Sequence, residues 1–181
     1  TRSDTASAGQ IRGLHSWIDN DSDRWIAAGS YNKLYIYSGA GDQFDITPTG
    51  LTAGNEDALQ PTGYGNSFYG KEYYGIARQE VATITPATTW AMDSWGEYLV
   101  ACSSSDGKIY EWQLATGTIA APITNAPVGC RSILVTEERF LFALGSAGNP
   151  RLVQWSDREN NTVWTPAATN EAGSLELQTT G

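Results

Sequence analysis

The chain has 181 residues, of which 40% are hydrophobic and 17% are charged, and its formal net charge is −9. This length predicts one domain or two small ones, and 19 glycines with few charged residues favour an all-β protein with many turns. The acidic excess is spread along the chain and leaves no basic face, which disfavours a conventional DNA-binding protein. No apolar run approaches the roughly 20 residues that a membrane-spanning helix needs, so we expect no membrane segment.

The first part of the chain predicts a lead-in followed by a four-stranded unit. Residues 1–10 are small and polar and predict an extended lead-in, and residues 11–48 form the first repeat. Asp and Asn at 19–23 favour a turn because their short side chains hydrogen-bond to nearby backbone. Pro48 ends the last strand because proline has no backbone N–H donor. The candidate strands are residues 13–18, 25–29, 33–37 and 43–48.

Residues 49–88 form an insertion in which Gly and Tyr interleave without a helical or strand period. Glycine makes the backbone permissive, whereas tyrosine rings lose free energy if they stay in water. A loop of this length in a compact domain is usually functional or disordered. We expect this insertion to pack on a neighbouring blade or on a neighbouring subunit. The candidates for such a subunit contact are Tyr64, Tyr69, Tyr73 and Tyr74.

Two further repeats, residues 89–127 and 128–170, follow the same order as the first. Their candidate strands are residues 89–95, 98–103, 108–113 and 118–123, and then residues 130–135, 140–145, 151–156 and 162–166. Apolar and polar residues alternate again at 174–178, which predicts that residues 171–181 hold the start of a further strand, the first of a fourth blade.

The repeats share one pattern: an aromatic-led strand, a short polar turn, a basic residue and a second strand. A small antiparallel unit of this kind cannot bury its own faces, so neighbouring units must stack, as the blades of a β-propeller do. The sequence therefore predicts an all-β fold with about three four-stranded antiparallel blades. Three blades do not close a propeller ring, so either further sequence or other chains complete it.

Aromatic residues recur near the ends of the repeats, where stacked blades would bury them. Full burial of such a ring contributes about 3 kcal/mol, which is a sufficient explanation for the repetition. A sugar-binding face is the alternative use of the seven tryptophans. The residues predicted to pack between blades are Trp25, Trp95, Tyr98, Trp112, Phe140, Trp155 and Trp164.

The sequence offers little for metal or cofactor chemistry. His15 is the only histidine, and without a second imidazole or a cysteine pair at zinc spacing the usual metal sites are disfavoured. We expect a backbone group to satisfy its ring. Cys102 and Cys130 lie outside any disulfide framework and are interpreted as isolated buried thiols. No Gly-rich phosphate loop is present, and we expect no cofactor.

Carboxylates for glycoside hydrolysis would have to come from Asp93, Glu97 or Asp106. Residues 104–112 approach the Asp-box turn of sialidase propellers, but Gly107 follows Asp106 directly, which breaks the required spacing. The Asp-Gly pair instead predicts a tight hairpin turn with glycine at positive φ. A hydrolase is therefore the weaker interpretation.

Four phrases of the sequence stand together: residues 24–37 with 44–48, 63–75, 89–97 and 155–164. In this order they resemble a family of tailed-phage structural proteins. The resemblance implies a β-propeller-bearing tail component, similar to the nozzle or tail-tubular B proteins and to the DNA-stabilisation hub of short-tailed phages. Such proteins are much longer than this chain, form commonly six-fold rings below the portal and adaptor, and line or close the DNA exit channel. The family has no catalytic residues to carry over.

The resemblance also implies a location and partners. The protein would be made in the host bacterial cytoplasm and reside in the virion tail, in contact with other tail or adaptor proteins and with passing viral DNA. An acidic channel wall would avoid the phosphate attraction that Lys and Arg clusters create. The leading interpretation is thus a structural protein and not an enzyme. Two others stay open. A carbohydrate-binding propeller needs two or three aromatic rings exposed together beside polar side chains on one face, and the exposure of Trp17, Trp90 and the insertion tyrosines tests it. A propeller glycosidase would use Asp93 or Glu97.

Overall fold

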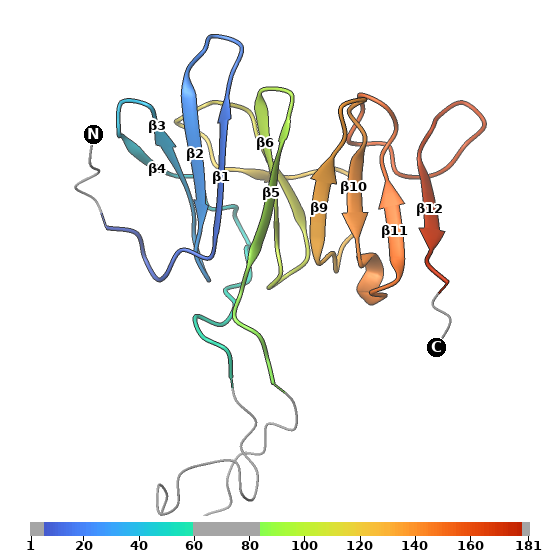
Figure 1. The fold of residues 1–181 in the computed structure, drawn as a ribbon, viewed down its shortest axis with the longest axis horizontal. Coiled ribbons are helices and arrows are strands. Elements are labelled where there is room, and N and C mark those ends of the chain that lie inside the picture. The colour runs from blue at the N-terminus through green and yellow to red at the C-terminus, as the bar shows by residue number, and fades with distance from the viewer. Residues whose placement is uncertain (1–5, 60–83, 179–181) are drawn as a thin grey trace, which may run out of the picture.

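The structure, a computed structural model, describes residues 6–59 and 84–178 (Figure 1). These ranges hold twelve β-strands in three four-stranded antiparallel sheets and one short 3-10 helix, η1 (Ser146–Gly148). The prediction of an all-β fold with three four-stranded repeats is therefore confirmed. Tyr64, Tyr69, Tyr73 and Tyr74, the tyrosines predicted to contact another subunit, lie outside the described residues.

Each sheet is a meander, because every strand pairs with the next one along the chain. Sheet 1 contains β1 (Gly13–Ile18), β2 (Arg24–Gly29), β3 (Leu34–Ser38) and β4 (Gln43–Asp45). Sheet 2 contains β5 (Trp90–Trp95), β6 (Tyr98–Ser103), β7 (Ile109–Trp112) and β8 (Ala121–Pro122). Sheet 3 contains β9 (Ser132–Val135), β10 (Leu141–Leu144), β11 (Leu152–Trp155) and β12 (Gly173–Glu176).

The turns follow from local side-chain chemistry. Between β1 and β2, one carboxylate oxygen of Asp19 accepts the backbone N–H groups of Asp21 at 3.0 Å and Asp23 at 2.9 Å. This is the backbone-bonded Asp turn that the sequence predicts. Between β6 and β7, Gly107 has a φ of +63°, as predicted, although the connection contains five residues and is not a tight two-residue turn.

The three sheets stand in a row, with sheet 2 in the middle (Figure 1). The first strands of the sheets are neighbours: β1 contacts β5, and β5 contacts β9. Residues 51–59 and 84–89, which hold the two described ends of the insertion, descend from sheets 1 and 2 on the same side of the row. Within the described residues the row does not close into a ring.

Two hydrophobic cores fill the spaces between the sheets, and β6 contributes to both because its side chains alternate. Leu99 and Ala101 point to sheet 1, whereas Val100 and Cys102 point to sheet 3. Core A, between sheets 1 and 2, consists of Trp17, Trp25, Ala27, Leu34, Ile36, Ile46, Trp90, Leu99, Ala101, Tyr110, Trp112 and Ala120. Core B, between sheets 2 and 3, consists of Trp95, Val100, Cys102, Ile109, Cys130, Ile133, Leu141, Ala143 and Trp164.

The third repeat departs from the prediction in its outer strand. Residues 162–166, predicted as the fourth strand, form a loop in which the indole of Trp164 is buried and donates to the Asn161 carbonyl at 2.7 Å. The ring is buried in core B, between sheets 2 and 3. The strand predicted to open a fourth blade instead pairs with β11 as β12, and it completes sheet 3.

Close contact between sheets 1 and 2 depends on glycine. A Cβ atom at Gly29 would lie 2.3 Å from Cδ1 of Trp90, whose indole donates to the Ser30 carbonyl at 2.7 Å. We therefore expect Gly29→Ala to lower the free energy of unfolding by about 1–3 kcal/mol through overpacking, measured by urea denaturation. Gly117→Ala is the control, because a Cβ atom there meets nothing within 4 Å. Equal stability of both variants would contradict this view of core A.

Candidate functional site

Two of the predicted inter-blade aromatic residues, Trp25 of sheet 1 and Trp112 of sheet 2, meet in core A. Trp112 contacts Trp25 edge-on, with ring centroids 5.5 Å apart, and it contacts Trp17 in the same way at 6.5 Å. The indole N–H of Trp25 donates to the Asp19 carboxylate and that of Trp17 donates to the Glu97 carbonyl, both at 2.9 Å. These bonds remove the cost of burying a polar N–H, so the rings serve packing between the sheets.

Core B receives three more of the predicted residues. Trp95 and Trp164 are buried in it, and Tyr98 packs against it. The guanidinium of Arg139, from the β9–β10 turn of sheet 3, lies 5.3 Å from the centroid of the Trp95 ring of sheet 2. This cation–π contact joins the two sheets at the end of β5.

Phe140 and Trp155 are not brought between two described sheets. Trp155 stacks on Phe142 at 5.8 Å on the outer face of sheet 3, and Phe140 lies 5.8 Å below the guanidinium of Arg158. The register explains the position of Trp155. Trp112 pairs with Leu99 in sheet 2, but Trp155 pairs with Phe142, one residue beyond the equivalent Leu141. An offset of one residue turns a side chain to the opposite face of a sheet.

His15 and Ser94 form a polar pair where the first strands of sheets 1 and 2 meet. The His15 Nε2 and the Ser94 Oγ are 2.8 Å apart, and the imidazole stacks on Trp17. The expectation that a backbone group satisfies His15 is therefore wrong. Burial lowers the pKa of His15, and the negative charge of Asp93 opposes this shift. Sequence reasoning missed Ser94, because nothing in the spacing pairs a residue of β1 with one 79 positions later.

The pair is not extended into a Ser-His-Asp arrangement. Asp93, next to Ser94 on β5, accepts the backbone N–H groups of Val135 at 2.7 Å and Ser94 at 2.8 Å. Its carboxylate therefore bonds to sheet 3, while Ser94 faces His15 of sheet 1. These bonds tie the first strands of the three sheets together.

The other two candidate acids also have structural partners. One carboxylate oxygen of Glu97 accepts from the side-chain amide of Asn20 at 2.8 Å. This bond links the β5–β6 turn of sheet 2 to the β1–β2 turn of sheet 1. The Asp106 carboxylate accepts the Tyr110 hydroxyl at 2.5 Å and the backbone N–H of Lys108 at 3.1 Å. Burial and the bond to Asp106 raise the pKa of Tyr110. The three acids are held in separate places by these contacts.

The two cysteines are free and buried, as predicted. Both belong to core B, where the Cys102 thiol lies 3.8 Å from the Cys130 carbonyl oxygen. Burial raises the pKa of Cys130 to about 11, and it raises that of Cys102 as well. Both side chains therefore stay protonated at neutral pH and act as small apolar groups.

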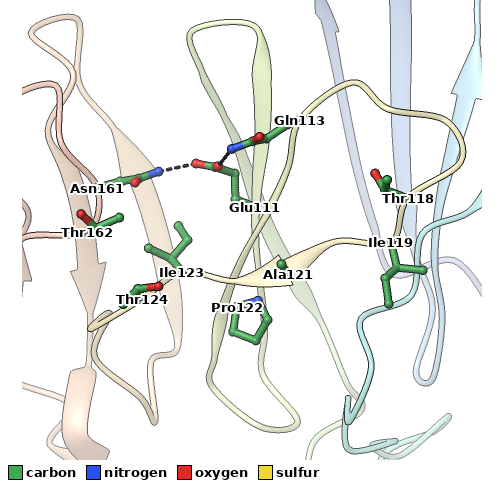
Figure 2. A pocket seen from close by; sticks show the side chains of 10 residues that line it. All are labelled: Glu111, Gln113, Thr118, Ile119, Ala121, Pro122, Ile123, Thr124, Asn161 and Thr162. Carbon is green, nitrogen blue, oxygen red and sulfur yellow. Dashed lines mark hydrogen bonds between the residues drawn. The ribbon is translucent and has the colours of Figure 1, made fainter.

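A hollow of about 340 Å³ opens between the outer edge of sheet 2 and the loop that follows β11 (Figure 2). Glu111 lies between two amides: it accepts from Gln113 at 2.6 Å and from the largely buried Asn161. Sequence reasoning missed this group, whose members come from different repeats. The rest of the lining is aliphatic or hydroxylic, with no aromatic ring on which a sugar could stack: Thr118, Ile119, Ala121, Pro122, Ile123, Thr124 and Thr162.

The two ends of the row of sheets expose apolar side chains. On the outer face of sheet 1 these are Leu14, Ile18 and Ile26. On the outer face of sheet 3 they are Leu134 and Leu175. Exposed apolar groups that gather on one surface are characteristic of an interaction site. The two exposed apolar faces follow from the sequence, because the predicted stacking of three units leaves one face at each end without a neighbour.

No protein-family model, curated protein or solved structure matches this chain. Among the residues that the structure describes, no three His, Cys, Asp or Glu side chains gather into a group that could hold a metal ion. In the same ranges, no helix has both the length and the apolar character to cross a bilayer.

The lowered pKa of His15 gives a pH dependence. Below the unfolded-state pKa of 6.5 the unfolded chain binds more protons than the folded one, so stability is lost as pH falls. Between about pH 7.5 and about pH 5.5 we expect the urea midpoint to fall, and His15→Gln to reduce this fall. Asp19 and Asp45, whose pKa values are lowered, titrate below this window. The same pH profile in both proteins would contradict a neutral His15 bonded to Ser94.

Proposed function

We propose that the protein is a structural component of a bacteriophage tail, built of β-propeller blades, that lines or closes the DNA exit channel as part of a ring. The observation that carries this proposal is the serial stacking of three equivalent sheets, together with an apolar face at each end of the row. A module of this kind is completed by further sheets, as propellers of four or more blades are. The resemblance of its sequence phrases to tailed-phage structural proteins points to the tail.

The polar groups of the described residues support a scaffold. His15, Asp93, Glu97 and Asp106, which are the side chains that suggested catalysis, all bond to partners that hold strands or turns in place. Three of these contacts join neighbouring sheets. We therefore propose that these groups have a structural role and not a catalytic one.

The burial of two tryptophans weakens the carbohydrate-binding alternative. It requires two or three aromatic rings exposed together on one face, but Trp17 and Trp90 are 8% and 7% exposed and belong to core A. Their indole N–H groups bond to carbonyls of the neighbouring sheet, so both rings are committed to packing.

In the proposed role the protein assembles into a ring, six-fold by the resemblance, which contacts other tail or adaptor proteins in the virion. The chain's net charge of −9 suits a wall past which DNA slides, because such a wall offers few phosphate contacts. The charge does not by itself select the tail, and it is the ring geometry that an experiment must establish.

We expect image averages of the purified, negatively stained protein to show rings with six-fold symmetry and a central hole wide enough for duplex DNA. The ring should retain no duplex DNA at about 0.15 M salt, since its lumen is acidic. A monomer or a particle without a hole would contradict the proposal. A ring that binds DNA with a steep salt dependence would overturn only the acidic lumen.

A further inference from the structure

The outer face of sheet 1 repeats a surface that is buried twice inside the molecule. In sheets 2 and 3, two alternate residues of the second strand are buried against the preceding sheet. The residues at these positions are Leu99 and Ala101 in sheet 2, Leu141 and Ala143 in sheet 3, and Ile26 and Ala28 in sheet 1. We call this surface of sheet 1, with Leu14 and Ile18 of β1, the rear face. By its register, the rear face is built to pack against a preceding sheet.

The rear face is open along the β1–β2 hairpin. Leu14 is 70% exposed, and a hollow of about 400 Å³ is lined partly by Ile18 and Ile26. Part of the rear face is covered: Ala28 is 1% exposed, and on the neighbouring β3 the Tyr35 hydroxyl accepts the backbone N–H of Ala8 from the lead-in at 3.0 Å. The hairpin half of the rear face is therefore accessible.

The outer face of sheet 3 repeats the complementary surface. Phe142 and Leu144 of β10 are equivalent in position to Ala27 and Gly29 of β2 and to Val100 and Cys102 of β6. In sheets 1 and 2 these positions face the following sheet. We call this surface the forward face. Its register positions across the four strands carry no charge: Ser132, Leu134, Phe142, Leu144, Val153, Trp155, Gly173 and Leu175. Leu175 is 57% exposed.

We propose that the forward face of one copy binds the rear face of a second copy of this chain, in a head-to-tail contact. The second copy carries the surface that fits, because the same two kinds of face already meet in cores A and B. A head-to-tail contact leaves one forward and one rear face free, so copies add to one another, and a ring forms where the rotation between copies closes. The inference deepens the proposed ring-forming function, and it rests on that function for the closure of the ring.

The test uses two variants of the chain that each block one face. Leu14→Glu places a charge on the rear face and Leu175→Glu places one on the forward face, both at positions exposed in the single chain. Burying either carboxylate in a contact should weaken association at least about 100-fold. Val128→Glu, in the loop between β8 and β9 and 60% exposed, is the matched control. Circular dichroism checks each fold; if either variant misfolds, Ile18→Glu and Leu134→Glu replace it on the same faces.

Sedimentation velocity should show an assembly for the unchanged chain and for Val128→Glu, and a monomer for each face variant alone. An equimolar mixture of the two face variants should form a heterodimer, because one intact forward face meets one intact rear face. Three results would overturn the inference. The first is assembly that persists in each of the two face variants, and the second is a mixture of the two that stays monomeric. The third is loss of assembly in Leu175→Glu but not in Leu14→Glu, which indicates that two forward faces pack together.

These outcomes separate the inference from the proposed function. Rings that persist in both face variants refute the head-to-tail contact and leave a ring-forming tail protein standing. Heterodimers from the mixture, with no ring from the unchanged chain, support the contact and refute the ring.

Discussion

The fold depends on each sheet covering the face of its neighbour. A four-stranded meander with large apolar side chains on both faces cannot be stable alone, and sheet 2 is the clearest case, since β6 sends Leu99 and Val100 into different cores. Full burial of a ring such as Trp112 contributes about 3 kcal/mol, against a total stability of about 5–15 kcal/mol for a typical domain. Separation of any two sheets would therefore remove most of the stability of the row.

Polar bonds set the angle and register at which the sheets stack. The indoles of Trp17 and Trp90 each donate to a carbonyl of the neighbouring sheet, and Ser94 and Asp93 connect β5 to both of its neighbours. Directional bonds of this kind select one arrangement among the many that hydrophobic burial alone permits. The same chemistry that suggests a reaction centre in the sequence serves assembly in the structure, and this supports the proposed scaffold role.

Most of the fold could be predicted from the sequence, because alternation and turn residues are local. The hairpins of all three repeats lie where the pattern places them. The face of Trp155 could not be predicted, since the β10–β11 connection contains η1, with Gly145, Ala147 and Gly148 at positive φ, and this connection sets its own register. The His15–Ser94 and Glu111–Asn161 pairs could not be predicted either, because they depend on which sheets become neighbours.

The central claim, that the sheets shelter one another, is tested most directly by hydrogen–deuterium exchange of the second strands. Each of β2, β6 and β10 is an inner strand of its own sheet with hydrogen-bonded neighbours on both sides, so three independent sheets would exchange at similar rates. Because only sheet 2 is covered on both faces among the described residues, β6 should be the slowest of the three to exchange. Equal protection of the three strands would contradict the account.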